Sequence, residues 1–394
     1  METRNYDVVI IGAGIVGSMV ARTLSKYNLS IAVLDREADV GMGQSTANSA
    51  ILHSGHDPVP GTMKAIMNKR GNELWKEYSK ELNVPITESG AMIVAVGPEE
   101  QKGIAELYER AQENGIPGVE VWSREQVLEQ EPHLSPDVTG ALWTPTAGVV
   151  DPFEGVLAAA ENAATNGAEF HLNTEVQEVI VENGRLLGVR TNNGEFRGRW
   201  VVNAAGVHSD EIMHMAGDHP EFQITARRGE YFIFDKAKVH ITNVLFPMPT
   251  DKGKGILVSV TAHGNTLIGP NALEIREKDD TSVTKEGLNE ILTNSTKLVP
   301  SLSPRDVIAT FAGVRATGNY KPDGKNKDFL IEISKSVDGL INLAGIESPG
   351  YVSAPAIGEE VERLLKEEAG ENLEVKADYN PIRPARVHFA KMDH

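Results

Sequence analysis

Three glycines near the amino terminus have the spacing of a turn that binds a phosphate group. Gly12, Gly14 and Gly17 form a G-x-G-x-x-G pattern between a β-branched run, residues 8–11, and a predicted helix. The first glycine permits a tight turn, the second lets a pyrophosphate touch the backbone, and the third lets helix and strand pack closely. The pyrophosphate then lies at the N-terminal end of the helix, where unpaired N–H groups and the helix dipole attract an anion. The pattern predicts a dinucleotide-binding unit.

An acidic residue completes this pattern. Residues 30–34 read as a second buried strand that ends at Asp35, about 20 residues past the glycines, where the fingerprint needs a carboxylate. Such a carboxylate accepts hydrogen bonds from a ribose diol and repels a 2′-phosphate. The sequence therefore favours the adenosine of FAD or NAD over that of NADP.

A polar loop follows where a nicotinamide enzyme would continue with further βαβ units. Residues 41–50 are mostly small or polar and include Ser45, Thr46, Asn48 and Ser49. Hydroxyl and amide groups in such a loop can bond the phosphates and ring edges of an extended cofactor. Composition alone leaves an ordinary surface loop as the alternative.

A histidine and several cations could act on a substrate beside that cofactor. His53 follows the polar loop, and an ordinary imidazole, with a pKa of ~6.5, is largely neutral at pH 7, as a general base must be. Arg228, Lys252, Lys254 and Arg315 could supply local positive charge for an anionic substrate. Arg315 is expected in a turn just past a strand, and surface ion pairing remains the alternative for Lys252.

Composition narrows the class of protein. The 394 residues include 38 Lys+Arg and 56 Asp+Glu, a net charge of −18, which argues against a nucleic-acid partner. Cysteine is absent, which excludes disulfides, thiolate zinc sites and iron–sulfur clusters. The histidines are not spaced as metal ligands, the amino terminus lacks the shape of a signal peptide, and no apolar run reaches the ~18 residues of a membrane span. We expect a cytoplasmic protein without an integral membrane segment and without a bound metal.

Periodicity predicts the framework that positions these residues. Asn183-Gly184 and Asn193-Gly194 stand between apolar runs and predict a three-stranded meander over 176–181, 186–191 and 197–203. Helices are expected over 15–27, 61–82, 152–165, 284–299 and 354–365, and further strands over 230–234, 256–260, 266–268, 307–311 and 340–343. The fold class is α/β, a doubly wound nucleotide-binding domain interrupted by a second, mostly antiparallel β domain.

Three segments together resemble one family. The glycine fingerprint, the loop over 45–49 with His53 after it, and the turn over 345–350 are similar to those of the FAD-dependent D-amino-acid-oxidase superfamily. Within it, the chain most resembles the type II glycerol-3-phosphate oxidases and the L-2-hydroxyglutarate oxidases. The resemblance covers nearly the whole chain, and its narrower signals lie at 53–55, 227–231 and 253–271.

The resemblance implies the domain boundaries and the site. A Rossmann-like FAD-binding domain is expected over 1–86, 145–220 and 308–370, a substrate-binding domain over 87–144 and 221–307, and a tail of no assigned role over 371–394. The residues implied for FAD are Gly12, Gly14, Gly17, Asp35, Ser45, Thr46, Asn48, Ser49, Val176, Gly206, Gly313, Gly345, Ile346, Glu347, Ser348, Pro349 and Gly350. His53 is implied as the catalytic base, and the expected substrate contacts are Lys254, Arg315, Ser348, Ser49 and Arg228.

The activity implied by the resemblance is oxidation of a small anionic secondary alcohol. The first expectation is sn-glycerol 3-phosphate oxidised to dihydroxyacetone phosphate, with oxygen reduced to hydrogen peroxide, because residues 249–255 resemble the phosphate-handling branch. The alternatives are oxidation of L-2-hydroxyglutarate to 2-oxoglutarate and a flavin-binding sensor without turnover. Larger relatives carry a cysteine-rich module that binds an iron–sulfur cluster, and this chain has no cysteine for that electron route. The oligomeric state is not readable from the sequence.

Overall fold

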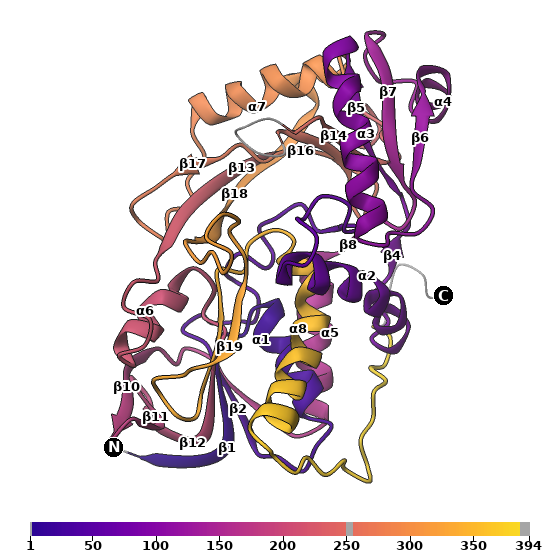
Figure 1. Cartoon of the computed structure of the whole chain (residues 1–394). Helices are drawn as coiled ribbons and strands as arrows, with labels where there is room; N and C mark the ends of the chain where they lie inside the picture. Colours follow the sequence, from indigo (N-terminus) through magenta and orange to yellow (C-terminus); the bar gives the residue numbers. More distant parts are fainter. Residues whose placement is uncertain (1, 250–254, 387–394) are drawn as a thin grey trace, which may run out of the picture.

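The computed structural model describes residues 2–249 and 255–386, which build two bodies around two large sheets. In Figure 1 the first sheet and the helices α1 (Ile15–Leu24), α5 (Pro152–Thr165) and α8 (Gly350–Arg363) lie below. The second sheet lies above them, with α3 (Pro98–Glu113) and α7 (Lys285–Leu298) on its outside. The two sheets therefore face each other across the middle of the molecule.

The first sheet has a parallel centre. Its strands are β1 (Thr3–Ile11), β2 (Ile31–Leu34), β9 (Ala168–His171), β10 (Val176–Glu182), β11 (Arg185–Thr191), β12 (Gly194–Asn203), β19 (Leu330–Ile333) and β20 (Leu340–Ala344). β1 runs parallel to β12 and β2, β2 to β9, and β12 to β20. All four residues of β2 and the last four of β1 are buried, as expected for parallel strands covered on both faces. The expected βαβ opening of a doubly wound sheet is confirmed.

The predicted meander is also present. β10, β11 and β12 pair antiparallel in sequence order. Asn183 and Gly184 both have positive φ, as the tight turn of a two-residue hairpin requires. β12 also pairs parallel with β1, the strand that leads into the glycine fingerprint. The meander is therefore joined to the parallel centre of the sheet.

The second sheet is mostly antiparallel. Its strands are β5 (Ala91–Val96), β6 (Glu120–Ser123), β7 (Val138–Thr144), β13 (Ile224–Phe234), β14 (Val244–Pro247), β15 (Leu257–Val260), β16 (Thr266–Gly269), β17 (Leu273–Glu274) and β18 (Val307–Gly318). The long strands β13 and β18 pair along nearly their whole lengths, and β17 flanks part of β13. One pair, β5 with β14, runs parallel.

Strand β18 corrects two expectations. The sequence predicted a strand over 307–311 followed by a turn, whereas the strand runs on to Gly318 and carries Arg315 within it. Gly313, which looked like a strand end, pairs with Gly229 of β13 and the ladder continues past both. β18 also belongs to the second sheet, although the expected boundary at residue 308 assigned it to the cofactor domain. The remaining domain boundaries stay a prediction.

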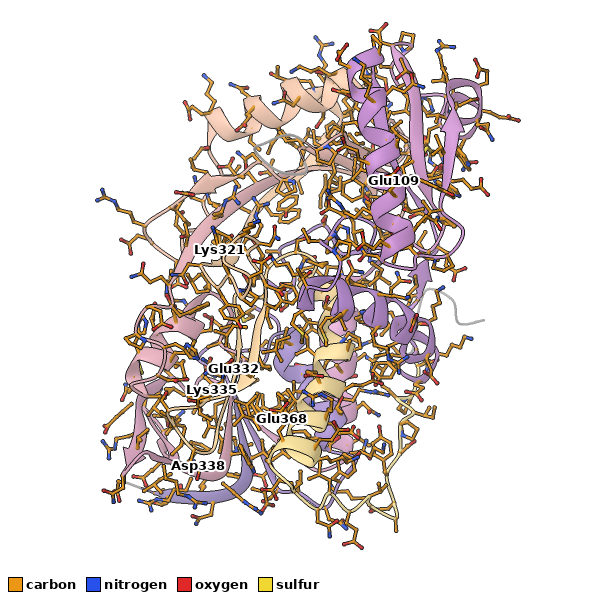
Figure 2. The ribbon with its side chains drawn as sticks, viewed as in Figure 1. Glu109, Lys321, Glu332, Lys335, Asp338 and Glu368 are labelled. Atoms are coloured by element: carbon orange, nitrogen blue, oxygen red, sulfur yellow. The ribbon has the colours of Figure 1, made fainter. Side chains whose placement is uncertain are left out.

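Smaller elements join the two sheets. A third sheet contains β3 (Ile51–Leu52), β4 (Ile86–Thr87) and β8 (Gly148–Val150), and the other helices are α2 (Met63–Glu81), α4 (Arg124–Gln130), α6 (Ser209–Met215), η1 (Gly206–His208), η2 (Pro304–Asp306) and η3 (Leu364–Glu368). The last long helix, α8, begins four residues before the expected start at 354. Across residues 2–249 and 255–386, no helix has the length and apolarity that crossing a bilayer demands. Charged side chains lie over the outside of both bodies, as Glu109 on α3 and Glu368 on η3 illustrate (Figure 2).

The segment after η3 is irregular but anchored. The carbonyl of Asn380 accepts hydrogen bonds from the side-chain amides of Asn162 and Asn166 on and after α5. Arg383 is 3% exposed and donates to Glu154, to Glu161 and to the carbonyl of Leu82. The expected tail at 371–394 therefore has a structural role over its described part, since it fastens α5 to the end of α2.

We predict that Arg383→Met destabilises the protein by about 3 kcal/mol, because it removes the buried partner of Glu154 and Glu161 and leaves them with the more exposed Arg386. Urea unfolding followed by tryptophan fluorescence measures this difference. Arg363→Gln is the matched control, since its ion pairs with Glu360, Glu367 and Glu368 are more exposed and are expected to contribute at most about 1 kcal/mol. Equal stability of the two variants would contradict the anchoring role.

Candidate active site

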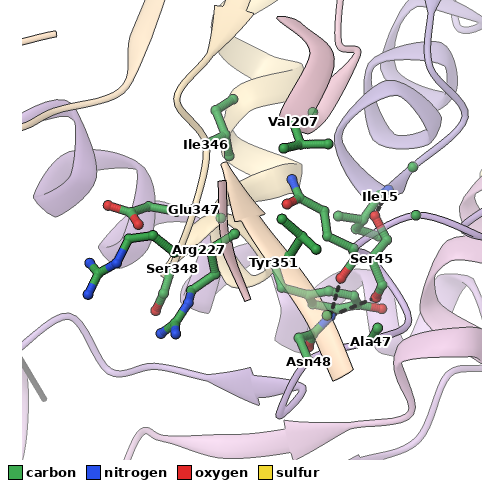
Figure 3. Close-up of a pocket in the computed structure, with 18 of the residues that line it drawn as sticks. Ile15, Ser45, Ala47, Asn48, Val207, Arg227, Ile346, Glu347, Ser348 and Tyr351 are labelled. Atoms are coloured by element: carbon green, nitrogen blue, oxygen red, sulfur yellow. Dashed lines mark hydrogen bonds between the residues drawn. The ribbon is translucent and has the colours of Figure 1, made fainter. Parts of the chain in front are cut away.

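A cavity of about 1430 Å³ lies between the two sheets. Its walls come from the carboxyl ends of the first sheet, the loop over 42–49, the turn over 346–351 and the inner face of β13 and β18. Figure 3 shows Ile15, Ser45 and Asn48 on one side, and Arg227, Glu347 and Ser348 on the other. The cavity thus joins the glycine fingerprint to the candidate substrate residues.

The fingerprint turn leaves no room for side chains. Gly12 has φ +106°, and a Cβ there would lie 2.4 Å from the carbonyl oxygen of Ala204. A Cβ on Gly17 would lie 1.9 Å from the carbonyl oxygen of Gly12, so helix α1 packs directly on the turn. Gly14 is the N-cap of α1 without a side-chain cap, and it lines the cavity. The backbone at the positive end of α1 therefore faces the space where a phosphate would bind.

Asp35 holds this turn in place. One oxygen of its carboxylate accepts a hydrogen bond from the Ala13 N–H at 2.7 Å, and the other accepts from the Glu37 N–H at 2.9 Å. The residue also lines the cavity, and its remaining lone pairs are available to a ribose diol. The carboxylate that the sequence assigned to ribose recognition thus also fixes the glycine turn.

The polar loop is folded against the fingerprint and is not an ordinary surface loop. Ser45 Oγ accepts a hydrogen bond from the Ile15 N–H at 2.9 Å. The Asn48 amide donates to the carbonyls of Gln44 and Ser45, which closes the loop on itself (Figure 3). These bonds set the loop's hydroxyls and amides along the cavity wall.

Most residues expected at the site line the cavity. They are Gly12, Gly14, Asp35, Ser45, Asn48, Ser49, His53, Val176, Gly206, Gly313, Arg315, Ile346, Glu347, Ser348, Pro349 and Gly350. Gly17, Thr46 and Gly345 do not line it. Gly17 packs under the fingerprint turn, Thr46 Oγ1 donates to the carbonyl of Gly41, and Gly345 begins the turn over 345–350 with φ +67°. Lys254 and Lys252 lie outside the described residues.

His53 is held by helix α2. Its carbonyl accepts hydrogen bonds from the side-chain amides of Asn68 at 2.7 Å and Asn72 at 3.1 Å, one helical turn apart. Its ring stacks on Phe246 with 5.7 Å between ring centroids, and Nε2 lies 3.4 Å from Ser348 Oγ. The imidazole is therefore fixed at the cavity wall beside the turn over 345–350.

Glu347 ties that turn to two other elements. Its carboxylate accepts from Lys64 Nζ on α2 at 3.1 Å and from Thr317 Oγ1 on β18 at 2.7 Å. Burial disfavours the charged carboxylate, but Lys64 and the Thr317 hydroxyl outweigh it and hold the pKa of Glu347 below its usual range. The carboxylate is thus ionised at neutral pH and fixes the cavity end of β18.

The inner face of β13 and β18 forms the floor of the cavity in three cross-strand pairs. These pairs are Arg227 with Arg315, Gly229 with Gly313, and Tyr231 with Phe311. The two aromatic rings stack with 4.5 Å between centroids, and burial raises the pKa of Tyr231 to about 12, so its hydroxyl stays protonated. At the glycine pair other segments pack directly on the floor, since a Cβ on Gly313 would lie 2.0 Å from the Ala47 carbonyl oxygen and a Cβ on Gly229 would lie 2.6 Å from Pro270 Cβ.

Arg228 is a correction to the expected site. It points to the opposite face of β13, where it is 3% exposed and pairs with Glu230 and Asp280. Successive residues of a strand face opposite sides, so its neighbour Arg227 lines the cavity instead. Sequence reasoning also missed Lys64 and Phe246, which come from a helix and a strand with no local motif.

The residues present fit an FAD molecule. Gly14 leaves the backbone cradle at the start of α1 without a side chain, and a Cβ there would lie 2.8 Å from Ser45 Oγ, so the glycine lets the polar loop pack against this cradle. From this cradle the cavity extends to Asp35 at one end and to His53 at the other. Hydroxyl, amide and backbone groups along its wall are the donors that a pyrophosphate and a flavin edge need.

Comparison with known proteins gives the family. The model of the FAD dependent oxidoreductase family, DAO, matches residues 7–364. The chain belongs to this family. FAD is therefore its cofactor, and the expected resemblance, enzyme class and α/β fold are confirmed.

Two relatives and a solved structure are similar over 77–98% of the chain. A glycerol 3-phosphate dehydrogenase from Caloramator mitchellensis is 40% identical over 98% of this chain and 79% of its own length. The FAD-bound, dithionite-reduced L-alpha-glycerophosphate oxidase from Mycoplasma pneumoniae is 31% identical, with a TM-score of 0.89 over 97% of this chain and 99% of that chain. A mitochondrial L-2-hydroxyglutarate dehydrogenase from Caenorhabditis elegans is 29% identical over 77% of this chain and 70% of its own length.

We predict that Asp35→Asn weakens FAD binding about tenfold or more, because hydrogen bonds to a charged acceptor contribute about 1.5–3 kcal/mol each. The measurement is the return of free-flavin fluorescence after dilution of the holoenzyme. Asp39→Asn is the matched control, since that exposed carboxylate accepts from the neighbouring Val40 N–H and does not line the cavity. Equal FAD retention in both variants would remove Asp35 from the cofactor site.

Proposed function

We propose that the chain oxidises sn-glycerol 3-phosphate to dihydroxyacetone phosphate and passes the electrons to oxygen, giving hydrogen peroxide. The observation that carries this proposal is the position of His53 and Arg315, a general base and a cation, on the wall and floor of the cavity that begins at the glycine fingerprint. The identities with a glycerol 3-phosphate dehydrogenase and with an L-alpha-glycerophosphate oxidase support the choice of substrate. A cytoplasmic location is part of the same proposal.

The residues of the chain bind, orient and deprotonate the substrate. When bound, FAD supplies the hydride acceptor at flavin N5. His53 Nε2 takes the proton of the secondary hydroxyl, and Ser348 Oγ, 3.4 Å from that nitrogen, orients the same hydroxyl. The guanidinium of Arg315 binds the anionic end of the substrate, and the pair of Tyr231 and Phe311 excludes water from the floor.

L-2-hydroxyglutarate is the second candidate substrate. It also joins a secondary alcohol to anionic groups, so the same base and cation would serve it. The lower identity and coverage of its dehydrogenases favour the phosphate substrate over it. A flavin-binding sensor without turnover has less support, because such a protein needs neither a base nor a cation beside its flavin.

We predict that His53→Gln keeps FAD bound but slows its reduction by glycerol 3-phosphate about a hundredfold, since positioned base catalysis contributes about 10²–10⁴-fold. Stopped-flow absorbance of the flavin under anaerobic conditions measures this rate. His263→Gln is the control, because that histidine lies outside the cavity and pairs with Asp151. Reduction at wild-type speed in the His53 variant would exclude it as the base.

Anaerobic mixing of the holoenzyme with each substrate tests the function itself. Bleaching of the flavin by glycerol 3-phosphate is expected. Bleaching by L-2-hydroxyglutarate alone would favour the second candidate, and no bleaching by either would favour the sensor. Repeating the reaction in air with detection of hydrogen peroxide tests oxygen as the acceptor.

A further inference from the structure

We propose that Arg227 is a specificity-determining residue that forms, with Arg315, a two-arginine clamp for a dianionic phosphate monoester. This inference rests on the proposed function, because it names the part of the site that would recognise the phosphate end of the substrate. The sequence singled out Arg228 for an anionic substrate, and the strand places Arg227 in the cavity instead.

The two arginines are direct cross-strand partners on the cavity floor. Arg227 of β13 stands opposite Arg315 of β18, and both line the cavity. Directly opposed residues on one face of a sheet have their Cβ atoms about 5 Å apart. Two guanidinium groups rooted at this spacing can both reach one small anion lying above the floor.

Among residues 2–249 and 255–386, neither arginine forms a salt bridge. Like charges directly opposite each other destabilise a sheet. Burial lowers the pKa of Arg315, and the charge of Arg227 adds to that effect, whereas Tyr231 and the charge of Glu347 partly oppose it. The Nε of each arginine is buried without a hydrogen-bond partner. Buried donors on charged groups normally have partners, so the arrangement points to an anion that accepts from both.

The acidic groups around the pair are already engaged or exposed. Glu347 is bound by Lys64 and by Thr317, so this carboxylate is matched by a cation of its own. Glu290 accepts from the Asn271 amide. Glu274 stands across from Arg227 on the edge strand β17, but it is exposed to solvent. Arg315 Nη2 donates to the neutral carbonyl of Asn271, and the charge of Glu347 acts on Arg315 without forming a salt bridge to it.

A phosphate monoester matches this charge better than a carboxylate does. Its charge at pH 7 is about −1.5 to −2, because its second pKa is about 6, and it offers three acceptor oxygens. Arginine forks fit phosphate geometry in a bidentate manner. The pair Gly229 and Gly313 lies next to the arginines, and a Cβ on Gly229 would lie 3.3 Å from Arg315 Nη2. A side chain at position 229 would therefore crowd the guanidinium group of Arg315.

The test compares Arg227→Gln with Arg227→Lys in the FAD-loaded enzyme. We expect KM for glycerol 3-phosphate to rise about 10- to 100-fold in the glutamine variant with kcat within about threefold, and to rise less in the lysine variant, which keeps the charge without the fork. The wild-type KM is expected to fall as pH rises through about 6, where the phosphate becomes a dianion, and the glutamine variant is expected to lose most of that dependence.

A second readout does not require turnover. Inorganic phosphate, titrated into oxidised holoenzyme and followed through the visible spectrum of the flavin, is expected to bind about tenfold or more weakly in Arg227→Gln. Arg276→Gln is the matched control, since this exposed arginine follows β17 and does not line the cavity.

The outcomes separate the clamp from the proposed function. Unchanged KM and unchanged phosphate affinity in Arg227→Gln overturn the clamp, as does equal loss of kcat in the glutamine and lysine variants with phosphate binding intact. If glycerol 3-phosphate does not reduce the wild-type flavin, the proposed function fails. Weaker phosphate binding in Arg227→Gln would then still support the clamp.

Discussion

The contact between Gly313 and the carbonyl of Ala47 determines how closely the two sheets approach. A Cβ on Gly313 would lie 2.0 Å from that oxygen, so β18 can rest on the polar loop only where it has no side chain. The loop in turn carries Ser45, which binds the first turn of α1. The loop therefore packs between the glycine fingerprint on one side and the floor of the cavity on the other. Any residue larger than glycine at 313 would separate the cofactor end of the site from its substrate end.

A second constraint comes from the carboxylate of Glu347. It joins the turn over 345–350 to α2 through Lys64 and to β18 through Thr317. Helix α2 also holds His53 through Asn68 and Asn72. The base, the turn and the floor thus share one helix as a common support.

The sequence predicted those parts of the site whose functional residues lie close together in the chain. The fingerprint, Asp35 and the loop over 45–49 are contiguous motifs, and they line the cavity as expected. The sequence pointed to Arg228 and not to its neighbour Arg227, because the orientation of a strand that is buried on both faces does not show in its pattern. The strand over 307–311 was expected to end before a turn containing Gly313, because glycine usually weakens a strand, whereas pairing of Gly313 with Gly229 sustains it here. Arg383 gave no signal, because its partners lie more than 200 residues earlier in the chain.

The strand order of the first sheet also has a consequence for synthesis on the ribosome. β1 lies between β2 and β12, and β12 begins at Gly194. The apolar residues Val8–Ile11 can therefore pair with β12 only after the ribosome has synthesised a long intervening segment. At roughly 5–20 residues per second, that delay is on the order of ten seconds or more. The nascent chain must keep a strand with two apolar faces away from other nascent chains during this time. Arg4 and Asp7 precede this apolar run in β1, and charged residues that flank such a run disfavour aggregation.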